Sequence, residues 1–458
     1  MTAAVLSAAG FDVTVLEEGR DVESGSVRPF SREQMESQYR ACGMTTAVGR
    51  PAISYTEGAC VGGGSQVNSG IYHPPPGDVI DRWADERHIP DLSADAFAVL
   101  AGRVEQRLAI RVDDSVGPSG AILARGANAL GWKVVEPRRW VNRRPDGSVD
   151  RRGMRETYLR DAIDSGTRLI SECRVLTIRE ESAGRLIVTA VRNQTPLEIS
   201  ARHVVLAAGA TQTPFLLTRS GLGGAGVGKR LRMHPTIKAV GVFDEVATRF
   251  DEVAATQIRE FSPAITIGHA ASRPGLTALA LANHPNAAHT LSSIWDHASV
   301  YYAATCGDGS GGIRAVPRSV DPIVQYGLAS NEASALTTGL ARLLHLLLAA
   351  GAARIYPSFP GAPIVRGEAD VATAIDALRI HRAPLMTVHL CGSVPLGSGG
   401  RAPSAVDPWG RLLAEPRITI NDASLIPSAP GVNPQGLVTA MALRNAERLA
   451  RELNGGLS

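Results

Sequence analysis

The chain has 458 residues, 44% hydrophobic and 20% charged, the composition of an ordinary soluble protein with enough apolar residues for two or three domains' worth of core. Its formal net charge of +3 is small for this length, which argues against a nucleic-acid-binding surface. None of the five cysteines has C-x-x-C spacing, so we expect no metal site and interpret them as free thiols in a reducing, cytoplasmic compartment.

The N-terminal segment predicts a helix, a stop and a strand that ends at an acid. MTAAVLSAAG is a run of small residues that ends at Gly10, and FDVTVLEEG predicts a short buried strand followed by Glu17. In a βαβ dinucleotide-binding unit such an acid lies about 20 residues after the glycine fingerprint. Counting back from Glu17 places the fingerprint at or before Met1, so we expect the first strand and its G-x-G-x-x-G loop to be missing.

A glycine-rich segment, GACVGGGSQVNSGI at 58–71, follows. Its consecutive glycines, which include Gly63 and Gly64, let a flat ligand or a phosphate approach the backbone closely, and Asn68 adds a hydrogen-bonding group. Alone, the segment is as consistent with an ordinary glycine-rich turn.

The middle of the chain predicts mixed α/β structure. Helices are expected at 79–110, in the two runs 79–88 and 92–110, and at 156–165. A strand is expected at 168–181 with its hairpin partner at 184–193, and a solvated basic loop at 143–155. HVVLAAGA, 203–210, predicts a fully buried strand, and Thr213-Pro214 then opens a helix with proline in its first turn.

The second half predicts an antiparallel sheet and a closing helix. Short β-like runs fill 236–330, a buried helix too short to span a bilayer covers 340–353, and 417–421 is a last buried strand. A long helix is expected at 434–453, with Asn433 as its N-cap. His389 alone fits a buried core histidine better than a catalytic base.

Together, the segments 58–68, 209–223, 227–235 and 422–448 resemble those of the glucose–methanol–choline (GMC) oxidoreductase family, over nearly the whole chain. Ala59 departs from the first signature, and 137–155 lacks a cysteine-containing stretch. The C-terminal segment is most similar to that of cholesterol oxidases and cellobiose dehydrogenases, in which a histidine and an asparagine face the flavin. The resemblance implies an FAD-binding Rossmann-like α/β domain at 1–80, 160–235 and 400–458, and a mostly antiparallel substrate-binding domain at 81–159 and 236–399.

The resemblance also implies a function and its residues. FAD oxidises a primary or secondary alcohol, a small molecule, to an aldehyde or ketone by hydride transfer to flavin N5, with His389 as base and Asn433 orienting the hydroxyl. The implied cofactor contacts are Glu17 at the ribose, Gly63, Gly64, Asn68 and Ile71 along the flavin, Val175 at the adenine, Asp422 and Ala423 at the ribityl chain, and Pro434 and Gln435 at the pyrimidine edge. The electron acceptor, oxygen or another, stays open.

Three alternatives remain at this point: a truncated, weakly FAD-binding and non-catalytic relative, an NAD-dependent dehydrogenase, and a flavoprotein with non-redox chemistry. The sequence does not name the alcohol. Four aromatic residues are candidates for the wall of its pocket, although core aromatics are the commoner case: Phe261, Trp295, Tyr301 and Tyr302.

Overall fold

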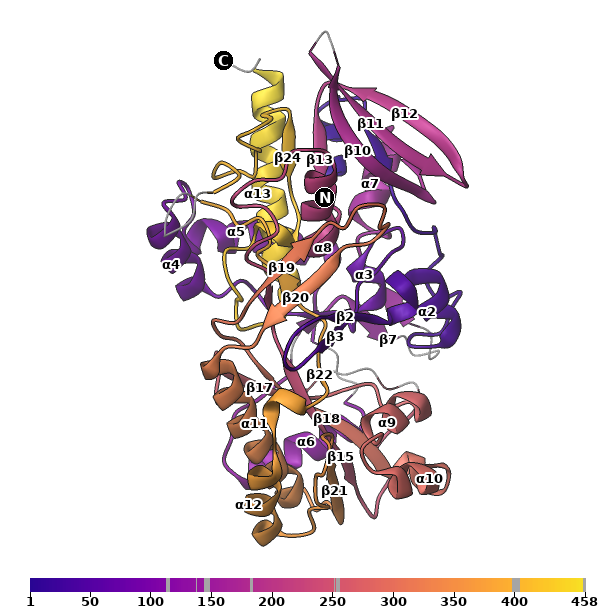
Figure 1. Cartoon of the computed structure of the whole chain (residues 1–458), viewed down its shortest axis with the longest axis vertical. Coiled ribbons are helices and arrows are strands. Elements are labelled where there is room, and N and C mark those ends of the chain that lie inside the picture. The colour runs from indigo at the N-terminus through magenta and orange to yellow at the C-terminus, as the bar shows by residue number, and fades with distance from the viewer. Residues whose placement is uncertain are drawn as a thin grey trace.

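The computed structural model describes residues 1–112, 116–136, 138–143, 149–181, 184–250, 252, 256–397 and 404–455. The molecule is elongated, and Figure 1 shows an upper part that holds both chain ends and a lower part built on a sheet. The terminal helices α1 (Thr2–Ala8) and α13 (Gln435–Asn454) pack against each other in the upper part. The predicted N-terminal helix, its strand and the closing helix are thereby confirmed.

Two parallel strand pairs lie in the upper part. β1 (Thr14–Leu16) pairs with β9 (Arg168–Ile170), and β13 (Val204–Leu206) pairs with β24 (Ile418–Ile420). β24 is buried as predicted, but β1 and most of β13 are only partly buried, against expectation. Each has a partner strand on one edge only among the described residues, and their residues line a large cavity.

An antiparallel sheet of β10 (Cys173–Glu181), β11 (Arg185–Arg192) and β12 (Thr195–Ala201) stands beside these pairs. The predicted hairpin is therefore confirmed. The strand expected at 168–181 is two strands in different sheets, because Glu172 takes a left-handed conformation (φ 54°) that turns the chain between β9 and β10.

Two helices of the upper part confirm the two helical runs expected within 79–110. α4 (Gly77–Arg87) ends at the left-handed His88, and Ser93 caps α5 (Ala94–Leu108) by accepting a hydrogen bond from the backbone N–H of Ala96 at 3.2 Å. Both helices bury apolar side chains in one core with α13. The segment 81–159, predicted to belong to the substrate domain, therefore contributes to both parts of the molecule. Its first two helices, α4 and α5, pack in the upper part, and α6 (Pro118–Ala129) packs in the lower part. The domain bounds stay a prediction.

Helix α8 (Gly209–Arg219) corrects one prediction. It begins four residues before Thr213, so Pro214 lies inside the helix rather than in its opening turn. A proline there leaves the carbonyl four residues earlier without its helical donor. That carbonyl belongs to Ala210, and it accepts a hydrogen bond of 2.6 Å from the hydroxyl of Ser393 instead.

The lower part is built on a nine-stranded sheet. Its main strands, in spatial order, are β2 (Thr45–Ala47), β3 (Ile53–Tyr55), β22 (Leu385–Thr387), β15 (Thr236–Val242), β18 (Ala298–Thr305), β17 (Ile265–His269), β16 (Gln257–Ile258) and β5 (Val134–Val135), and β21 (Arg354–Pro357) also pairs with β15. All pairings are antiparallel except that of β22 with β3, so the predicted antiparallel sheet is confirmed. α11 (Ser330–Ala349) and α6 cover one of its faces. α11 contains residues 340–349 of the segment 340–353 predicted to be a buried helix.

The remaining elements are connecting or peripheral. They are α2 (Arg32–Gln38), α3 (Gly64–Val67), β4 (Ile71–Tyr72), β6 (Arg138–Arg139), β7 (Val141–Arg143), β8 (Val149–Arg151), α7 (Tyr158–Asp164), β14 (Arg232–Met233), α9 (Pro274–Ala280), α10 (Pro285–Ile294), β19 (Ser310–Arg314), β20 (Ile323–Gly327), α12 (Glu368–Ala377) and β23 (Leu390–Cys391), with short 3₁₀ turns at Arg40–Gly43, Trp295–His297, Ile380–Arg382 and Ala423–Leu425. Contrary to expectation, β20 pairs with β19 outside the large sheet. No helix in the described part of the chain is long and apolar enough to cross a membrane.

Candidate active site

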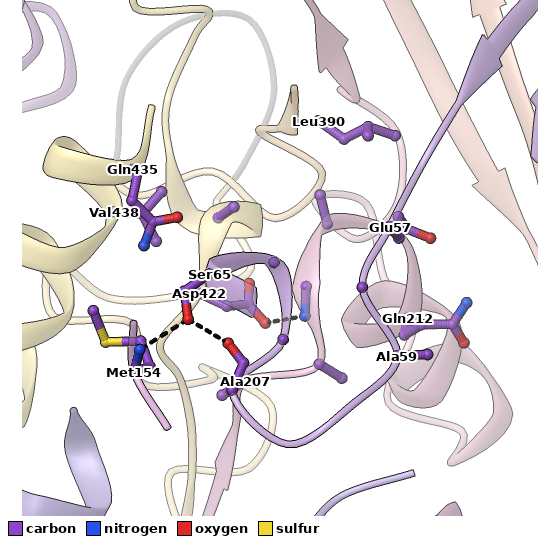
Figure 2. Close-up of a pocket in the computed structure, with 18 of the residues that line it drawn as sticks. Glu57, Ala59, Ser65, Met154, Ala207, Gln212, Leu390, Asp422, Gln435 and Val438 are labelled. Atoms are coloured by element: carbon purple, nitrogen blue, oxygen red, sulfur yellow. Dashed lines mark hydrogen bonds between the residues drawn. The ribbon is translucent and has the colours of Figure 1, made fainter. Parts of the chain in front are cut away.

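A cavity of about 1620 Å³ is lined by strands of the upper part, including β1 and β13, and by strands of the lower sheet, including β15 and β18. Residues of the predicted segments 58–71, 209–223 and 422–448 line it, together with His389. Figure 2 shows Glu57 and Ala59 on one loop, Ser65 on the short helix after it, and Asp422 and Gln435 on the C-terminal segment, all among the residues that line the cavity. The structure therefore brings every predicted site residue to one cavity.

Glycines give the upper end of the cavity its open backbone. A Cβ added to Gly63, Gly64 or Gly209 would meet no atom within 4 Å, so space lies directly beside the chain there. Ser65 fixes this loop, because its hydroxyl donates to the Gly62 carbonyl at 2.7 Å and accepts from the Met154 N–H at 2.9 Å. The loop offers a flat group the close approach that a side chain would block.

Asn68 and Arg151 hold the other side of the same loop. The Asn68 side-chain oxygen accepts from the Gly70 N–H at 3.0 Å, and the Arg151 guanidinium donates to the backbone carbonyls of Ser65 at 2.7 Å and Asn68 at 2.8 Å. Burial lowers the pKa of Arg151 to about 10. The basic segment predicted as a solvated loop is therefore partly structural; its residues 144–148 lie outside the described part.

Two of the carboxylates that line the upper end are predicted site residues. Asp422 accepts hydrogen bonds from the Gly209 N–H at 2.9 Å, the Thr213 hydroxyl at 2.5 Å and the Ser424 N–H at 2.8 Å, which ties the start of α8 to the C-terminal segment. Glu17, at the end of β1, accepts from the Gly19 N–H at 2.8 Å, and burial raises its pKa to about 7. Ile71, Val175, Ala423, Pro434 and Gln435 also line the cavity. Their assigned contacts with a cofactor stay predictions.

A chain of hydrogen-bonded side chains forms the lower end. The Nδ1 atoms of His389 and His234 are 2.9 Å apart, and Asn433 Nδ2 is 3.3 Å from His389 Nε2. Asn433 Oδ1 accepts from Gln257 Nε2 at 3.2 Å. The prediction that Asn433 is the N-cap of α13 is wrong, because α13 begins at Gln435, after Pro434. The Asn433 amide hydrogen-bonds to Gln257 and His389 and makes no capping bond.

Gln257 extends the chain in two directions. Its Oε1 is 2.8 Å from His73 Nε2, and its Nε2 also lies 3.2 Å from the Tyr302 hydroxyl. Sequence reasoning missed His73, His234 and Gln257. Only His234 had a signal, because it lies in the segment 227–235 that carries part of the family resemblance.

The bonding pattern assigns one consistent set of protons. If His73 donates to Gln257, and Gln257 donates to Asn433, then Asn433 donates to a lone pair on His389 Nε2, and His389 Nδ1–H donates to His234. Burial lowers the pKa of His389 well below its usual value, with smaller effects from His234 and His73. Burial also lowers the pKa of His234 and of His73 to about 4. His389 is thus neutral at pH 7, with a lone pair at the cavity.

One of the four candidate wall aromatics lines the cavity. Tyr302 does, whereas Tyr301, the preceding residue on β18, points into the core on the opposite sheet face. Phe261 packs edge-on against Trp132, and the Trp295 N–H donates to the Ser272 carbonyl at 3.0 Å. Neither Phe261 nor Trp295 is part of the lining.

Known proteins resemble this chain in both sequence and fold. Family models described as GMC oxidoreductase match residues 35–236 and 313–442. An uncharacterized GMC-type oxidoreductase of Sinorhizobium fredii is 35% identical, over 97% of this chain and 90% of its own length. A long-chain-alcohol oxidase of Arabidopsis thaliana is 27% identical, over 98% of this chain and 65% of its own. The crystal structure of pyridoxine 4-oxidase from Mesorbium loti shares the fold, with a TM-score of 0.72, 17% identity, and coverage of 99% of this chain and 97% of that one.

Proposed function

The chain belongs to the GMC oxidoreductase family, whose cofactor is FAD, and from this premise we propose that it oxidises a primary or secondary alcohol to an aldehyde or ketone. One observation carries the proposal. The neutral imidazole of His389, with its Nε2 lone pair and the Asn433 amide beside it, lies in the same cavity as the open glycine loop. Base, orienting group and cofactor space are therefore contiguous.

The residues of the upper end fit FAD. Gly63, Gly64 and Gly209 leave room beside the backbone for a flat ring or a phosphate, while Glu17 and Asp422 present acceptors for hydroxyl groups. The start of α13 at Gln435 adds the partial positive charge of a helix N-terminus. When bound, FAD supplies the acceptor for the hydride that leaves the carbinol carbon.

The protein's own part in the reaction is proton transfer and positioning. When the substrate hydroxyl replaces the Asn433 N–H as donor to His389 Nε2, that nitrogen takes the hydroxyl proton, which suits an imidazole that is neutral at pH 7. The Asn433 amide hydrogen-bonds the substrate oxygen and holds the carbinol carbon in place. His234 accepts from His389 Nδ1–H, so it keeps the lone pair of His389 on the cavity side and stabilises the imidazolium that forms.

Relatives support the same class of reaction. Long-chain-alcohol oxidases of Arabidopsis thaliana and a 5-(hydroxymethyl)furfural oxidase of a Methylovorus species match this chain at 24–27% identity. Their names all refer to oxidases, and the first group to alcohols. A pair formed by His389 and Asn433, as in cholesterol-oxidase-like members, is our assignment for this chain.

A second candidate is a relative that binds FAD weakly and does not turn over. The observation that supports it is that β1 and β13 are only partly buried. Both strands line the cavity, and among the described residues each has a partner strand on one edge only. A cofactor held by such edges would have fewer fixed contacts. The two candidates differ in a property that can be measured directly.

The test is an anaerobic titration of the purified protein with a panel of primary and secondary alcohols. We expect a yellow protein with bound FAD, whose oxidised absorbance is bleached by at least one alcohol. Air is then admitted to show whether oxygen restores the oxidised spectrum. A colourless protein that does not bind added FAD would favour the second candidate, and a yellow protein that no alcohol bleaches would contradict alcohol oxidation.

A further inference from the structure

One face of the large sheet forms the floor of the cavity's lower end. On β15, Thr236 and Lys238 line the cavity, whereas Ile237 and Ala239, which alternate with them, are buried in the core beneath α11. Farther along the same strand, Val240 and Val242 pack with residues of α9 and α10. Lys238 is therefore the last residue of β15 on this face before the helices cover it.

The strand register places Lys238 in line with the hydrogen-bonded chain. Gln257 is paired with Gly268, Gly268 with Tyr302, and Tyr302 with Lys238, so the four residues form one row across β16, β17, β18 and β15. A Cβ on Gly268 would meet the Tyr302 hydroxyl at 2.5 Å, which shows that the tyrosine ring lies over this glycine. The ring leans toward Gln257 and away from Lys238.

Lys238 is consequently left without a polar partner. The described part of the chain provides no hydrogen bond or ion pair for its ammonium group, and burial lowers its pKa to about 8, so it is still mostly protonated at neutral pH. Only three lysines occur in the chain, and the other two, Lys133 and Lys229, are exposed. An unpaired cation facing a cavity costs free energy unless something pairs with it.

The surroundings of Lys238 are positive or apolar. Among the described residues that line this end, Arg259 is a second cation and none is an aspartate or glutamate. Glu252 comes within 3.8 Å of the lining residue His269, but its carboxylate accepts from the Ser119 N–H and hydroxyl and does not face the cavity. The rest of the lining here is largely apolar and includes Leu276, Val300, Met386 and Val388.

We propose that Lys238 binds an anionic group, a carboxylate or a phosphate, at the far end of an alcohol substrate whose hydroxyl lies at His389 and Asn433. This inference rests on the proposed function. The backbones of Gln257 and Lys238 are three strand spacings apart on this sheet face, about 14 Å. On the other side, β22, which ends two residues before His389, pairs with β15, the strand of Lys238. Hydroxyl and anion are therefore joined by a chain that lies along this face. The apolar lining suits an apolar chain between them. The substrate class is an ω-hydroxy acid or a comparable hydroxyalkyl phosphate.

The first experiment measures binding alone, so it does not depend on turnover. Straight-chain alkyl carboxylates, alkyl phosphates and the matching amides are titrated into the FAD-loaded protein by calorimetry. We expect the better anion to bind about tenfold or more tightly than its amide, since a hydrogen bond to a charged group is stronger than one between neutral groups. Which anion binds more tightly identifies the carboxylate or phosphate form.

The controls assign the preference to Lys238. Lys238→Met should abolish the preference for the anion while leaving the amide affinity unchanged, and Lys133→Met, with the same charge change at an exposed site, should retain it. Equal affinity of the wild type for anions and amides would overturn the proposal, and so would a Lys238→Met protein that keeps the preference. If Lys238→Met does not fold, Lys238→Gln, which keeps a polar side chain, takes its place in the same comparison.

The second experiment uses anaerobic reduction by ω-hydroxy acids and their methyl esters. The acid should reduce the wild type with the lower KM, and Lys238→Met should remove that difference while kcat changes little. A protein that binds anions through Lys238 but is not reduced by any of these alcohols would leave the anion site standing and reject the proposed function. A protein reduced equally well by acid and ester would keep the function and reject the anion site.

Discussion

The two ends of the cavity are built in different ways. The upper end consists of backbone: open glycines at 63, 64 and 209 with the carboxylates Glu17 and Asp422 beside them. The lower end consists of side chains from separate elements, joined through neutral imidazoles and amides. We infer that ligand binding at the upper end depends on empty space beside the backbone, whereas the chemistry of the lower end depends on the direction of individual hydrogen bonds.

The largest effect should come from the lower end. His389→Ala should slow anaerobic flavin reduction by about 100-fold or more, the usual contribution of one proton-transfer group, and leave the FAD content unchanged. Stopped-flow absorbance measures the rate, and the spectrum of the purified protein measures FAD. His289→Ala, at an exposed histidine outside the cavity, is the control. A fully active His389→Ala protein would refute the role of base.

A change at the upper end should instead weaken FAD binding. Gly64→Val places a side chain in open space at the cavity, where it should weaken FAD binding by about 5–150-fold, the equivalent of ~1–3 kcal/mol of overpacking. FAD titration of the apoprotein measures this. Gly102→Val, also in a helix and with open space but outside the cavity, is the matched control. Unchanged FAD affinity in Gly64→Val would place the cofactor elsewhere.

The hydrogen-bond direction at the lower end can be tested at His234. His234→Leu removes the acceptor for His389 Nδ1–H and should lower the rate of flavin reduction by about tenfold, with FAD content unchanged. His234→Asn retains an acceptor and should recover most of the rate. If both variants were equally slow, the effect of His234 would be one of packing rather than of proton position.

The smallest effect concerns stability and the acid at the upper end. The pKa of Glu17 is raised from 4.5 to about 7 by burial, so the folded state favours the protonated carboxyl. Its stabilising contribution is complete below pH 4.5 and is lost as the pH rises through 7. Glu17→Gln should therefore gain stability relative to the wild-type apoprotein between these values, measured as urea unfolding against pH. Glu86→Gln, the same substitution at an exposed site, is the control.

The sequence by itself determined what local patterns encode. Alternating apolar residues gave the antiparallel strands, and the glycine run at 62–64 gave a loop with open space. Each of these depends on residues that are neighbours in the chain, since strand periodicity and glycine's freedom are properties of short segments. The motifs that carry the family resemblance are also short segments of this kind, so they can be recognised in the sequence alone.

Only the tertiary structure decided which partners each group finds. Pro214 lies inside a helix because Ser393, far along the chain, satisfies the carbonyl that the proline leaves free. Asn433 orients toward His389 and Gln257 rather than capping α13. Strand register and loop packing, which no local pattern specifies, bring His73 to Gln257 and place Lys238 on the cavity floor. A hydrogen bond between residues more than a hundred positions apart is fixed only when the sheet brings them together, so the chemistry of the lower end is a property of the fold.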